Sequence, residues 1–259
     1  MALKKSCASR SLPSARGSES MENRDISQIM AESLEMGSHV IEPYAKTICA
    51  TYGIPVPRFK VAKNGKEAVE YAGELGYPVV LKIISQDIIH KNDAGGVVLN
   101  INTAKEVRKA YREILADVRR YKPDAEILGI LVEEMVPPST EIVVGGIRDP
   151  QFGPTLMFGL GGILVEILRD VAFRVCPVTE QDALEMISEV KGYQILKGYR
   201  GKPAVDINKI VEILLATSKL VMDYPEIKEI DLNPVIVYEK EAKVVDSKII
   251  LQKPGTTET

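Results

Sequence analysis

The sequence of 259 residues contains no tryptophan, and aromatic residues make up only 5% of it. Proteins that bind single-stranded nucleic acid need aromatic platforms on which the bases stack, so this class is disfavoured. Charge of one sign is not in excess either, because 33 Lys and Arg stand against 36 Asp and Glu, for a net charge of -3. We therefore expect no nucleic-acid partner, and any anion must be bound by a local cluster of charge.

Cysteine is also scarce. Cys7, Cys49 and Cys176 are an odd number of residues, far apart and without CxxC spacing. This argues against a disulfide framework or a cysteine zinc site and favours reduced thiols in a cytoplasmic protein. No apolar run approaches the roughly 20 residues that span a bilayer, so no membrane partner is expected. The remaining composition, 45% hydrophobic and 27% charged, is that of a globular chain of one or two domains.

The first 40 residues differ from the rest of the chain. Serine recurs up to Ser27, and no acidic residue precedes Glu19. Such a composition buries little apolar surface, so residues 1–40 are predicted to form a flexible extension without a function. Met21 inside this segment is an alternative start of translation.

From Glu42 onward the sequence shows regular helix and strand patterns, and Asn64, Thr103, Thr179 and Asp206 are predicted helix caps. The predicted helices are 42–53, 66–75, 103–121, 180–190 and 207–222. The predicted strands are 58–62, 79–84, 97–101, 127–133, 141–147, 155–158 and 171–176, with a closing hairpin of 227–238 and 243–251. Helices and strands do not alternate strictly, so the pattern favours an α+β fold over a doubly wound sheet.

The clearest local pattern in the sequence is an alternation in the closing hairpin. Glu229, Asp231 and Asn233 fall on one face of the predicted strand, while apolar residues fall on the other. A row of oxygen ligands suits Mg²⁺, which proteins hold with one or two carboxylates plus substrate phosphates. A four-residue turn at 239–242 would pair Asp246 with Val235, on the same face as Asn233. The alternative is a solvated polar face on an edge hairpin.

Two further features are suited to holding phosphate. Lys82 interrupts an otherwise apolar strand, and a buried ammonium group needs an anion, either a nucleotide phosphate or a protein carboxylate. Glycine clusters at 95–96, 145–146 and 159–162 allow backbone amides to approach a phosphate. They do not match the Walker spacing, and loops or β-bulges are the usual explanation for such glycines.

His90 is one of two histidines and lies between Ile89 and Lys91 in a polar loop that ends in glycine. A neutral imidazole is a competent nucleophile or proton carrier near pH 7. A loop histidine with no chemical role is the more common case. The other histidine, His39, has no comparable setting.

Taken together, these features resemble the ATP-grasp β subunits of ADP-forming acyl-CoA synthetases, in particular the archaeal ADP-forming acetate–CoA ligases, over residues 42–250. The resemblance rests on ordered motifs: AK and YGIPVP within 45–57, YPVVLKI at 77–83, DIIHKNDAGGV at 87–97, VEEM at 132–135, GLGG at 159–162 and EIDLNP at 229–234. Several motifs in the family's order make the match specific.

The resemblance implies an ATP-grasp fold in which two α+β subdomains clasp a nucleotide. It places the N-terminal subdomain at 41–130, the C-terminal subdomain at 131–252 and a tail at 253–259. Lys82 would contact the phosphates of ATP or ADP, and Glu141 would reach the ribose. The residues Glu133, Glu134 and Met135 would form the hinge beside adenine.

The resemblance also implies a mechanism. Asn233 and Asp246 match Mg²⁺ ligands of the related succinyl-CoA synthetases, and Asp231 matches a carboxylate beside the phosphohistidine. His90 would be that phosphohistidine and would relay a phosphoryl group from a histidine of the α subunit to ADP, usually within an α₂β₂ assembly. Asn92 and Ala94 depart from the family's commoner Ser and Val, but neither carries the chemistry.

Three functions therefore compete at the level of sequence. The first is an acid–thiol ligase β subunit that is active only with its α subunit. The second is a self-sufficient ATP-grasp ligase that joins a carboxylate to an amine, and the third is a non-catalytic nucleotide-binding regulator. His90 favours the first, because neither alternative needs a relay histidine.

Overall fold

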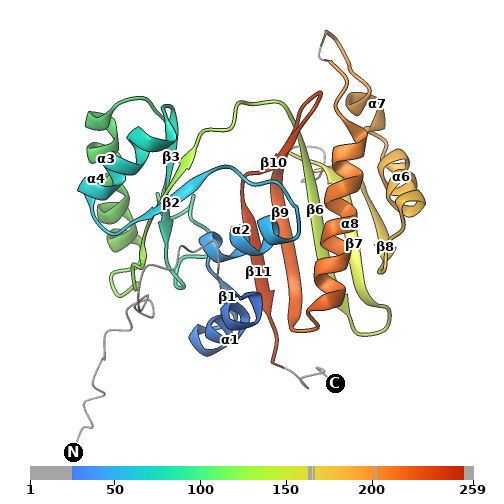
Figure 1. Cartoon of the computed structure of the whole chain (residues 1–259), viewed down its shortest axis with the longest axis horizontal. Helices are drawn as coiled ribbons and strands as arrows, with labels where there is room; N and C mark the ends of the chain where they lie inside the picture. The colour runs from blue at the N-terminus through green and yellow to red at the C-terminus, as the bar shows by residue number, and fades with distance from the viewer. Residues whose placement is uncertain (1–24, 163–164, 166, 202, 254–259) are drawn as a thin grey trace, which may run out of the picture.

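The structure is a computed structural model that describes residues 25–162, 165, 167–201 and 203–253. The chain folds around two antiparallel sheets, each with its own helices and its own buried core. Figure 1 shows the smaller sheet with α3 and α4 on one side and the larger sheet with α6 and α8 on the other. Helices together with antiparallel sheets are the expected α+β class.

The smaller sheet has the strand order β2-β5-β3-β4. Its strands are β2 (Phe59–Ala62), β3 (Val79–Ile84), β4 (Val97–Ile101) and β5 (Gly129–Glu134). The helices α3 (Gly65–Leu75) and α4 (Ala104–Tyr121) pack on it. Asn64 and Thr103 cap these helices as predicted, because each side chain accepts a bond from a free amide of the first turn.

The larger sheet has the strand order β1-β11-β9-β6-β7-β8, and β10 pairs with β9. Its strands are β1 (His39–Val40), β6 (Thr140–Asp149), β7 (Gly153–Leu160), β8 (Val171–Val175), β9 (Ile227–Val237), β10 (Ala242–Val244) and β11 (Ser247–Leu251). The helices α6 (Glu180–Glu189) and α8 (Ile207–Asp223) pack against β6 to β9, and α7 (Tyr193–Leu196) follows α6. Thr179 caps α6 and Asp206 caps α8, as predicted.

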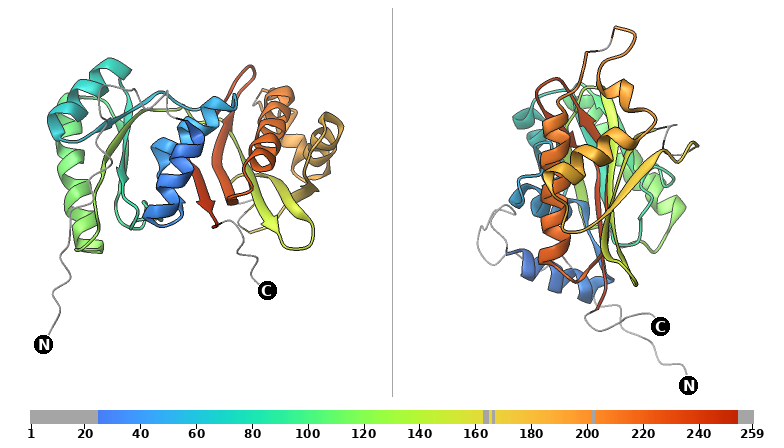
Figure 2. Two further views of the ribbon diagram at one scale, coloured as in Figure 1. Left: turned by 60° about the horizontal axis from the view of Figure 1, so that its bottom comes forward. Right: turned by 90° about the vertical axis from the view of Figure 1, so that its right-hand side faces the viewer.

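Two N-terminal helices belong to the core of the larger sheet. These are α1 (Ile26–Met36) and α2 (Glu42–Thr51), which Figure 2 shows between the smaller unit and α8. Ile26, Ile29 and Met30 are buried at helical spacing, so the prediction of a flexible extension is wrong for residues 25–40. The serine-rich start of the chain hid this apolar stripe, and residues 1–24 lie outside the described part.

The predicted subdomain boundaries also need correction. Helix α2 lies within the predicted N-terminal subdomain, yet Tyr44, Ala45 and Ile48 are buried in the larger core. The predicted boundary after residue 130 falls inside β5, which ends at Glu134 and pairs within the smaller sheet. That unit therefore runs from β2 through β5. Residues 135–139 then connect the two sheets. The predicted tail begins at Lys253, and residues 254–259 lie outside the described part.

The closing hairpin has a different register from the predicted one. Val235 pairs with Val244, not with Asp246, because the connection after Tyr238 is shorter than the predicted turn. Val245 and Asp246 interrupt the second strand and separate β10 from β11. The amide of Asn233 donates to the carbonyl of Asp246 at 3.2 Å, so the two predicted metal ligands are direct neighbours by this other route.

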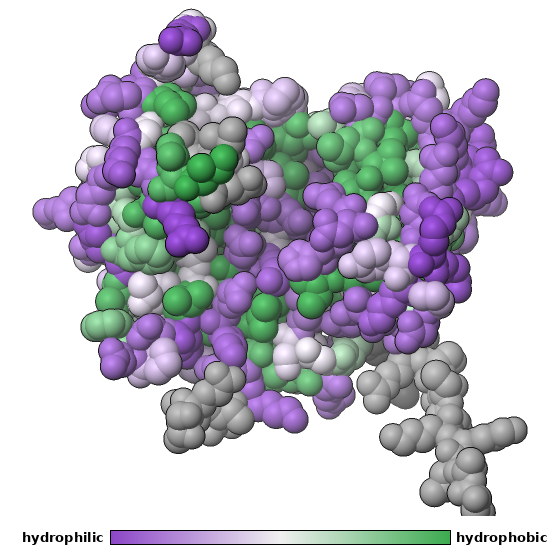
Figure 3. Space-filling view, turned by 180° about the vertical axis from the view of Figure 1, so that it is seen from behind, coloured by the Kyte–Doolittle hydropathy of each residue, from purple (hydrophilic) through white to green (hydrophobic). Residues whose placement is uncertain are grey.

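The face of the larger sheet opposite α8 carries exposed apolar side chains on β6 and β8. Figure 3 views the molecule from behind and shows hydrophilic side chains in the middle of this side, with apolar ones beside them. Ile147, Phe173 and Val175 are each about half exposed. Ile147 on β6 and Val175 on β8 share a cross-strand row through Thr155 of β7, and Phe173 lies two positions before Val175. Asp231 lies in the same cross-strand row as Phe173, so this face continues into the polar centre.

Candidate functional site

The site is built around Lys82 in the middle of β3, a strand whose six residues are all buried. Its Nζ donates to Glu42 Oε1 and to the carbonyl of Val245, each at 2.7 Å, and lies 3.2 Å from Glu133 Oε1. A buried ion pair was one of the two explanations for this lysine, and it is the one seen here. Contact with a nucleotide phosphate stays a prediction.

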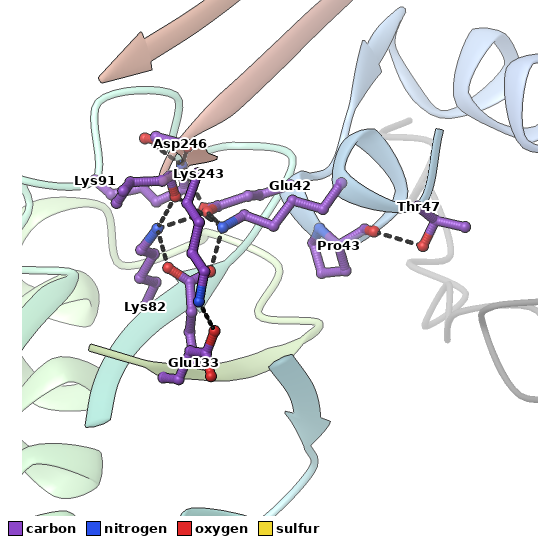
Figure 4. Close-up of polar contacts among 11 residues, drawn as sticks. Glu42, Pro43, Thr47, Lys82, Lys91, Glu133, Lys243 and Asp246 are labelled. Atoms are coloured by element: carbon purple, nitrogen blue, oxygen red, sulfur yellow. Dashed lines mark hydrogen bonds and ion pairs between the residues drawn. The ribbon is translucent and has the colours of Figure 1, made fainter. Parts of the chain in front are cut away.

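A second buried lysine completes this cluster, and sequence reasoning missed it. Lys46 has 0% of its side chain exposed, forms an ion pair with Glu133 and donates to the carbonyl of Val245 at 2.7 Å. It also lies 3.4 Å from Glu42, one turn earlier on α2. The available signal was this i,i+4 pair on a helix, but such pairs usually lie at the surface. Figure 4 shows Glu42 from α2 directed towards Lys82 and Glu133 from the smaller sheet.

Alternation of charge is what makes this cluster stable. Burial by itself would raise the pKa of Glu42, but Lys82, Lys46 and Lys91 outweigh it and hold that pKa well below its usual range. Burial lowers the pKa of Lys82 in turn, yet Glu42, Glu133 and Asp246 outweigh it and raise the value. Glu42 and Lys82 therefore keep their charges because their partners are buried with them, whereas at Glu133 burial outweighs Lys46 and Lys82 and raises the pKa.

The predicted hinge lies at the end of β5, where the chain leaves the smaller sheet. The carboxylate of Glu133 belongs to the lysine cluster, whereas that of Glu134 pairs with Arg58 at 2.8 Å and Lys243 at 2.7 Å. The amide of Met135 donates to the carbonyl of Pro78 at 3.1 Å. These contacts tie the start of the connection to both sheets, which is the position that a hinge requires. Contact with adenine stays a prediction.

A cavity of about 150 Å³ lies beside this cluster and brings together residues from both sheets. It is lined by side chains that include His90 from the β3–β4 loop, Asp231 and Asn233 from β9, and Asp246 between β10 and β11. The structure therefore assembles the predicted histidine, the predicted carboxylate and the predicted metal ligands in one place. Glu141 does not line this cavity; it is exposed on β6, packed against Gly161.

Sequence reasoning also missed His39, which lines the same cavity from β1. Its Nδ1 is buried and has no hydrogen-bond partner among the described residues. Burial, with smaller contributions from Lys91 and Lys248, lowers the pKa of His39 to about 4, so the ring is neutral at pH 7. No local pattern marked this residue, because strand pairing with β11 brings it to the site.

The carboxylates of the cavity differ in their surroundings. Burial raises the pKa of Asp231, Lys248 opposes this shift, and Glu229 and Asp246 add to it. Asp231 lines the same cavity as His90, and a carboxylate placed there can orient an imidazole. The chemistry available at His90 is therefore nucleophilic attack or proton transfer in a partly enclosed pocket.

The donor set fits Mg²⁺ bound together with a nucleotide. Asp246 supplies a carboxylate and Asn233 an amide oxygen, and both face the cavity. Proteins commonly hold Mg²⁺ with one or two carboxylates and leave the remaining positions to phosphates and water. Across the described ranges, no group of three or more His, Cys, Asp and Glu side chains could hold a metal by itself.

Two other expectations concern the chain as a whole. Cys49 and Cys176 are free and buried, as the sparse cysteines predict. Within the described residues, no helix is both long enough and apolar enough to cross a membrane.

Comparison with known proteins identifies the family. The family model described as an ATP-grasp domain matches residues 33–251. This chain belongs to the ATP-grasp domain family. The predicted fold is therefore confirmed, and the match begins within α1, in agreement with the structured N-terminal helices rather than with an extension to residue 40.

The relatives of this ATP-grasp chain confirm the narrower resemblance. It is 55% identical over 212 residues to the Pyrococcus furiosus acetate–CoA ligase (ADP-forming) I subunit beta, covering 82% of this chain and 91% of the relative. A solved dinucleotide-forming acetyl-coenzyme A synthetase 1 of Ca. Korarchaeum cryptofilum, in complex with coenzyme A, Ca-AMPCP and HgCl+, is 50% identical with a TM-score of 0.86. That match covers 88% of this chain and 100% of the other.

A further structure of the Korarchaeum synthetase bears on the histidine loop. It contains coenzyme A and Mg-AMPPCP, and its phosphohistidine segment points towards the nucleotide-binding site. It is 46% identical to this chain, with a TM-score of 0.78 and coverage of 88% of this chain and 100% of that one.

Proposed function

We propose that this chain is the nucleotide-binding β subunit of an ADP-forming acetate–CoA ligase and that it works with a separate α subunit. The observation that carries the proposal is the placement of His90 in one cavity with Asp231, Asn233 and Asp246, next to the buried lysines. The relatives named as β subunits of such ligases support it. An α₂β₂ assembly and a cytoplasmic location, in keeping with the free thiols, are part of the proposal.

In the proposed reaction His90 carries a phosphoryl group between two sites. A ring nitrogen of His90 attacks the phosphorus of a phosphohistidine on the α subunit; a new N–P bond forms and the donor N–P bond breaks. A β-phosphate oxygen of ADP then attacks the phosphorus on His90, which gives ATP and restores the imidazole. No oxidant or further reactant is needed, because each step exchanges one bond to phosphorus for another.

The remaining residues would position and neutralise the reactants. Lys82 would meet the nucleotide phosphates, and Asp231 would orient the ring of His90. The hinge of Glu133, Glu134 and Met135 would border adenine, and Glu141 would reach the ribose. Asn233 and Asp246 would hold Mg²⁺, which neutralises phosphate charge during transfer. Transfer of this kind needs positioning more than covalent activation, which suits a site rich in fixed charges.

The self-sufficient ligase and the regulatory module explain the cavity less well. A ligase that phosphorylates its substrate directly has no use for an exposed histidine opposite a metal-binding pair. A regulator needs neither His90 nor the Asp231–Asn233 face. Turnover by the purified chain alone, with a carboxylate and an amine, would favour the ligase.

Labelling with γ-³²P ATP and Mg²⁺ tests the proposal. We expect one acid-labile, base-stable phosphoryl group per chain and complete loss of the label in His90→Ala. The matched control is His39→Gln, which changes the other imidazole of the same cavity and should keep the label. Label that survives in His90→Ala would contradict the assignment. Addition of the α subunit should then permit ATP synthesis from acetyl-CoA, ADP and phosphate.

A further inference from the structure

The loop that holds His90 is anchored at both ends in the smaller sheet and exposed between these anchors. Ile88 and Ala94 are buried in the core of the smaller sheet. The amide of Gly96 donates to the carbonyl of Lys91 at 2.7 Å, which closes the loop on itself. Between these anchors Ile89 and His90 are exposed. The direction in which the imidazole points is therefore decided by the few residues at the tip.

Lys91 is the tip residue that reaches the other half of the molecule. Its Nζ lies 2.9 Å from Glu42 Oε2 on α2 and 3.3 Å from Asp246 Oδ1 beside β11. Both partners belong to the larger sheet and its helices, whereas the loop belongs to the smaller sheet. Figure 4 shows Lys91 beside Glu42 and Asp246. The ammonium group of Lys91 thus links the loop, at the position next to His90, to Glu42 and Asp246 on the other half of the molecule.

The ion pairs of Lys91 are largely shielded from solvent, and their loss would not leave Glu42 unpaired. Only 16% of the Lys91 side chain is exposed, so solvent screens the pairs less than it screens pairs at the surface. Glu42 also accepts a bond from Lys82 at 2.7 Å, so loss of Lys91 would not leave a buried carboxylate without a partner. A variant of Lys91 should therefore fold.

We propose that Lys91 is a positioning residue that holds His90 on the nucleotide side of the cavity, an inference that rests on the proposed phosphoryl-carrying role of His90. Asp246, the anchor of the tie, is also a proposed ligand of the nucleotide's metal. The carboxylate of Asp246 would therefore help to position both the nucleotide phosphates, through the metal, and the imidazole of His90, through Lys91. To reach the phosphohistidine of the α subunit, the tip must give up both ion pairs.

This geometry predicts that loss of Lys91 affects one half-reaction and not the other. Transfer between nucleotide and His90 needs the tied position and should slow when Lys91 is lost. Transfer between the α subunit and His90 needs the released position and should not slow. A residue that only stabilises the fold would change both steps together.

The test compares Lys91→Gln, which removes the cation, with Lys91→Arg, which restores it. Lys105→Gln, an exposed lysine on α4, is the control. In the chain without nucleotide, amide hydrogen exchange at residues 89–92 should be at least about fivefold faster in Lys91→Gln and unchanged in the control. Single-turnover labelling of His90 from Mg-ATP should be about tenfold slower, a factor set by the loss of one strong ion-pair contact.

The second arm measures labelling of His90 in the α–β complex supplied with acetyl-CoA and labelled phosphate. This rate should stay within about twofold of the wild type in Lys91→Gln, and Lys91→Arg should recover most of the Mg-ATP rate. Equal losses in both half-reactions, or unchanged loop exchange, would overturn the positioning role. A wild-type chain that takes no label at all would instead refute the proposed function itself.

Discussion

Lys46 offers a sharp test of the buried charge cluster. Its ammonium group is fully buried, pairs with Glu133 and Glu42 and donates to the carbonyl of Val245. Lys46→Met keeps the length of the aliphatic chain and removes only the charge and its hydrogen bonds. The cluster of Lys46, Lys82 and Lys91 with Glu42, Glu133 and Asp246 would then hold two cations against three anions.

The structure sets the size of the effect. Removal of one partner from a buried ion pair costs about 3–5 kcal/mol, because the other charge stays buried without compensation. Lys82 still lies 3.2 Å from Glu133, so the lower end, about 3 kcal/mol, applies. For a domain of this size, 1 kcal/mol shifts the melting temperature by about 2–4 °C, which gives a loss of about 6–12 °C.

The assay is thermal unfolding followed by circular dichroism, since the chain has no tryptophan for fluorescence. Lys109→Met is the control, because its ion pair with Glu113 is exposed, long at 3.7 Å and worth less than about 1 kcal/mol. The double variant Lys46→Met, Glu133→Leu removes one charge of each sign and should lose less than the sum of the two single losses. A Lys46→Met variant that melts within about 2 °C of the wild type would refute the reasoning.

Three further predictions concern the loop, a helix and a histidine. Gly96→Ala should lower the free energy of unfolding by about 1–3 kcal/mol, because the new Cβ would lie 2.5 Å from Ile83 Cγ2; urea titration measures this. Gly73→Ala is its matched opposite: the glycine lies inside α3 with nothing within 4 Å of the added Cβ, so the same titration should show a gain of about 0.5–1 kcal/mol. His39 has a pKa lowered to about 4, so the fold favours the neutral ring and loses stability as pH falls from about 6.5 towards 4. His39→Gln should reduce this loss between pH 6.5 and 4 in urea titrations at a series of pH values, and an unchanged slope would argue against a buried neutral ring.

Most secondary structure was predictable from the sequence because its signals are local. Asn64, Thr103, Thr179 and Asp206 cap the helices that they were expected to cap. The alternation in β9 correctly put Ile230 and Leu232 on the face that packs into the core, with Asp231 on the opposite face. Where local signals competed, prediction failed: the serine-rich start masked the apolar stripe of α1.

The candidate site was predictable only in part. His90, Asp231, Asn233 and Asp246 were recognisable by their motifs, and the structure brings them to one cavity. The pairing of Asp246 was wrong, because no local signal marked the break between β10 and β11. Lys46 was not singled out and His39 was set aside, because their surroundings come from distant parts of the chain.

The sequence by itself determined the helices with their caps, the faces of the strands and the motifs of an ATP-grasp chain. These depend on neighbours within a few residues, where spacing translates directly into geometry. Only the tertiary structure decided which charges meet, since Lys46 and Glu133 are 87 residues apart and come together where α2 meets β5 of the smaller sheet. A buried charge is tolerated only beside its partner, so the role of Lys82, Lys46 and Lys91 follows from packing that no local pattern encodes.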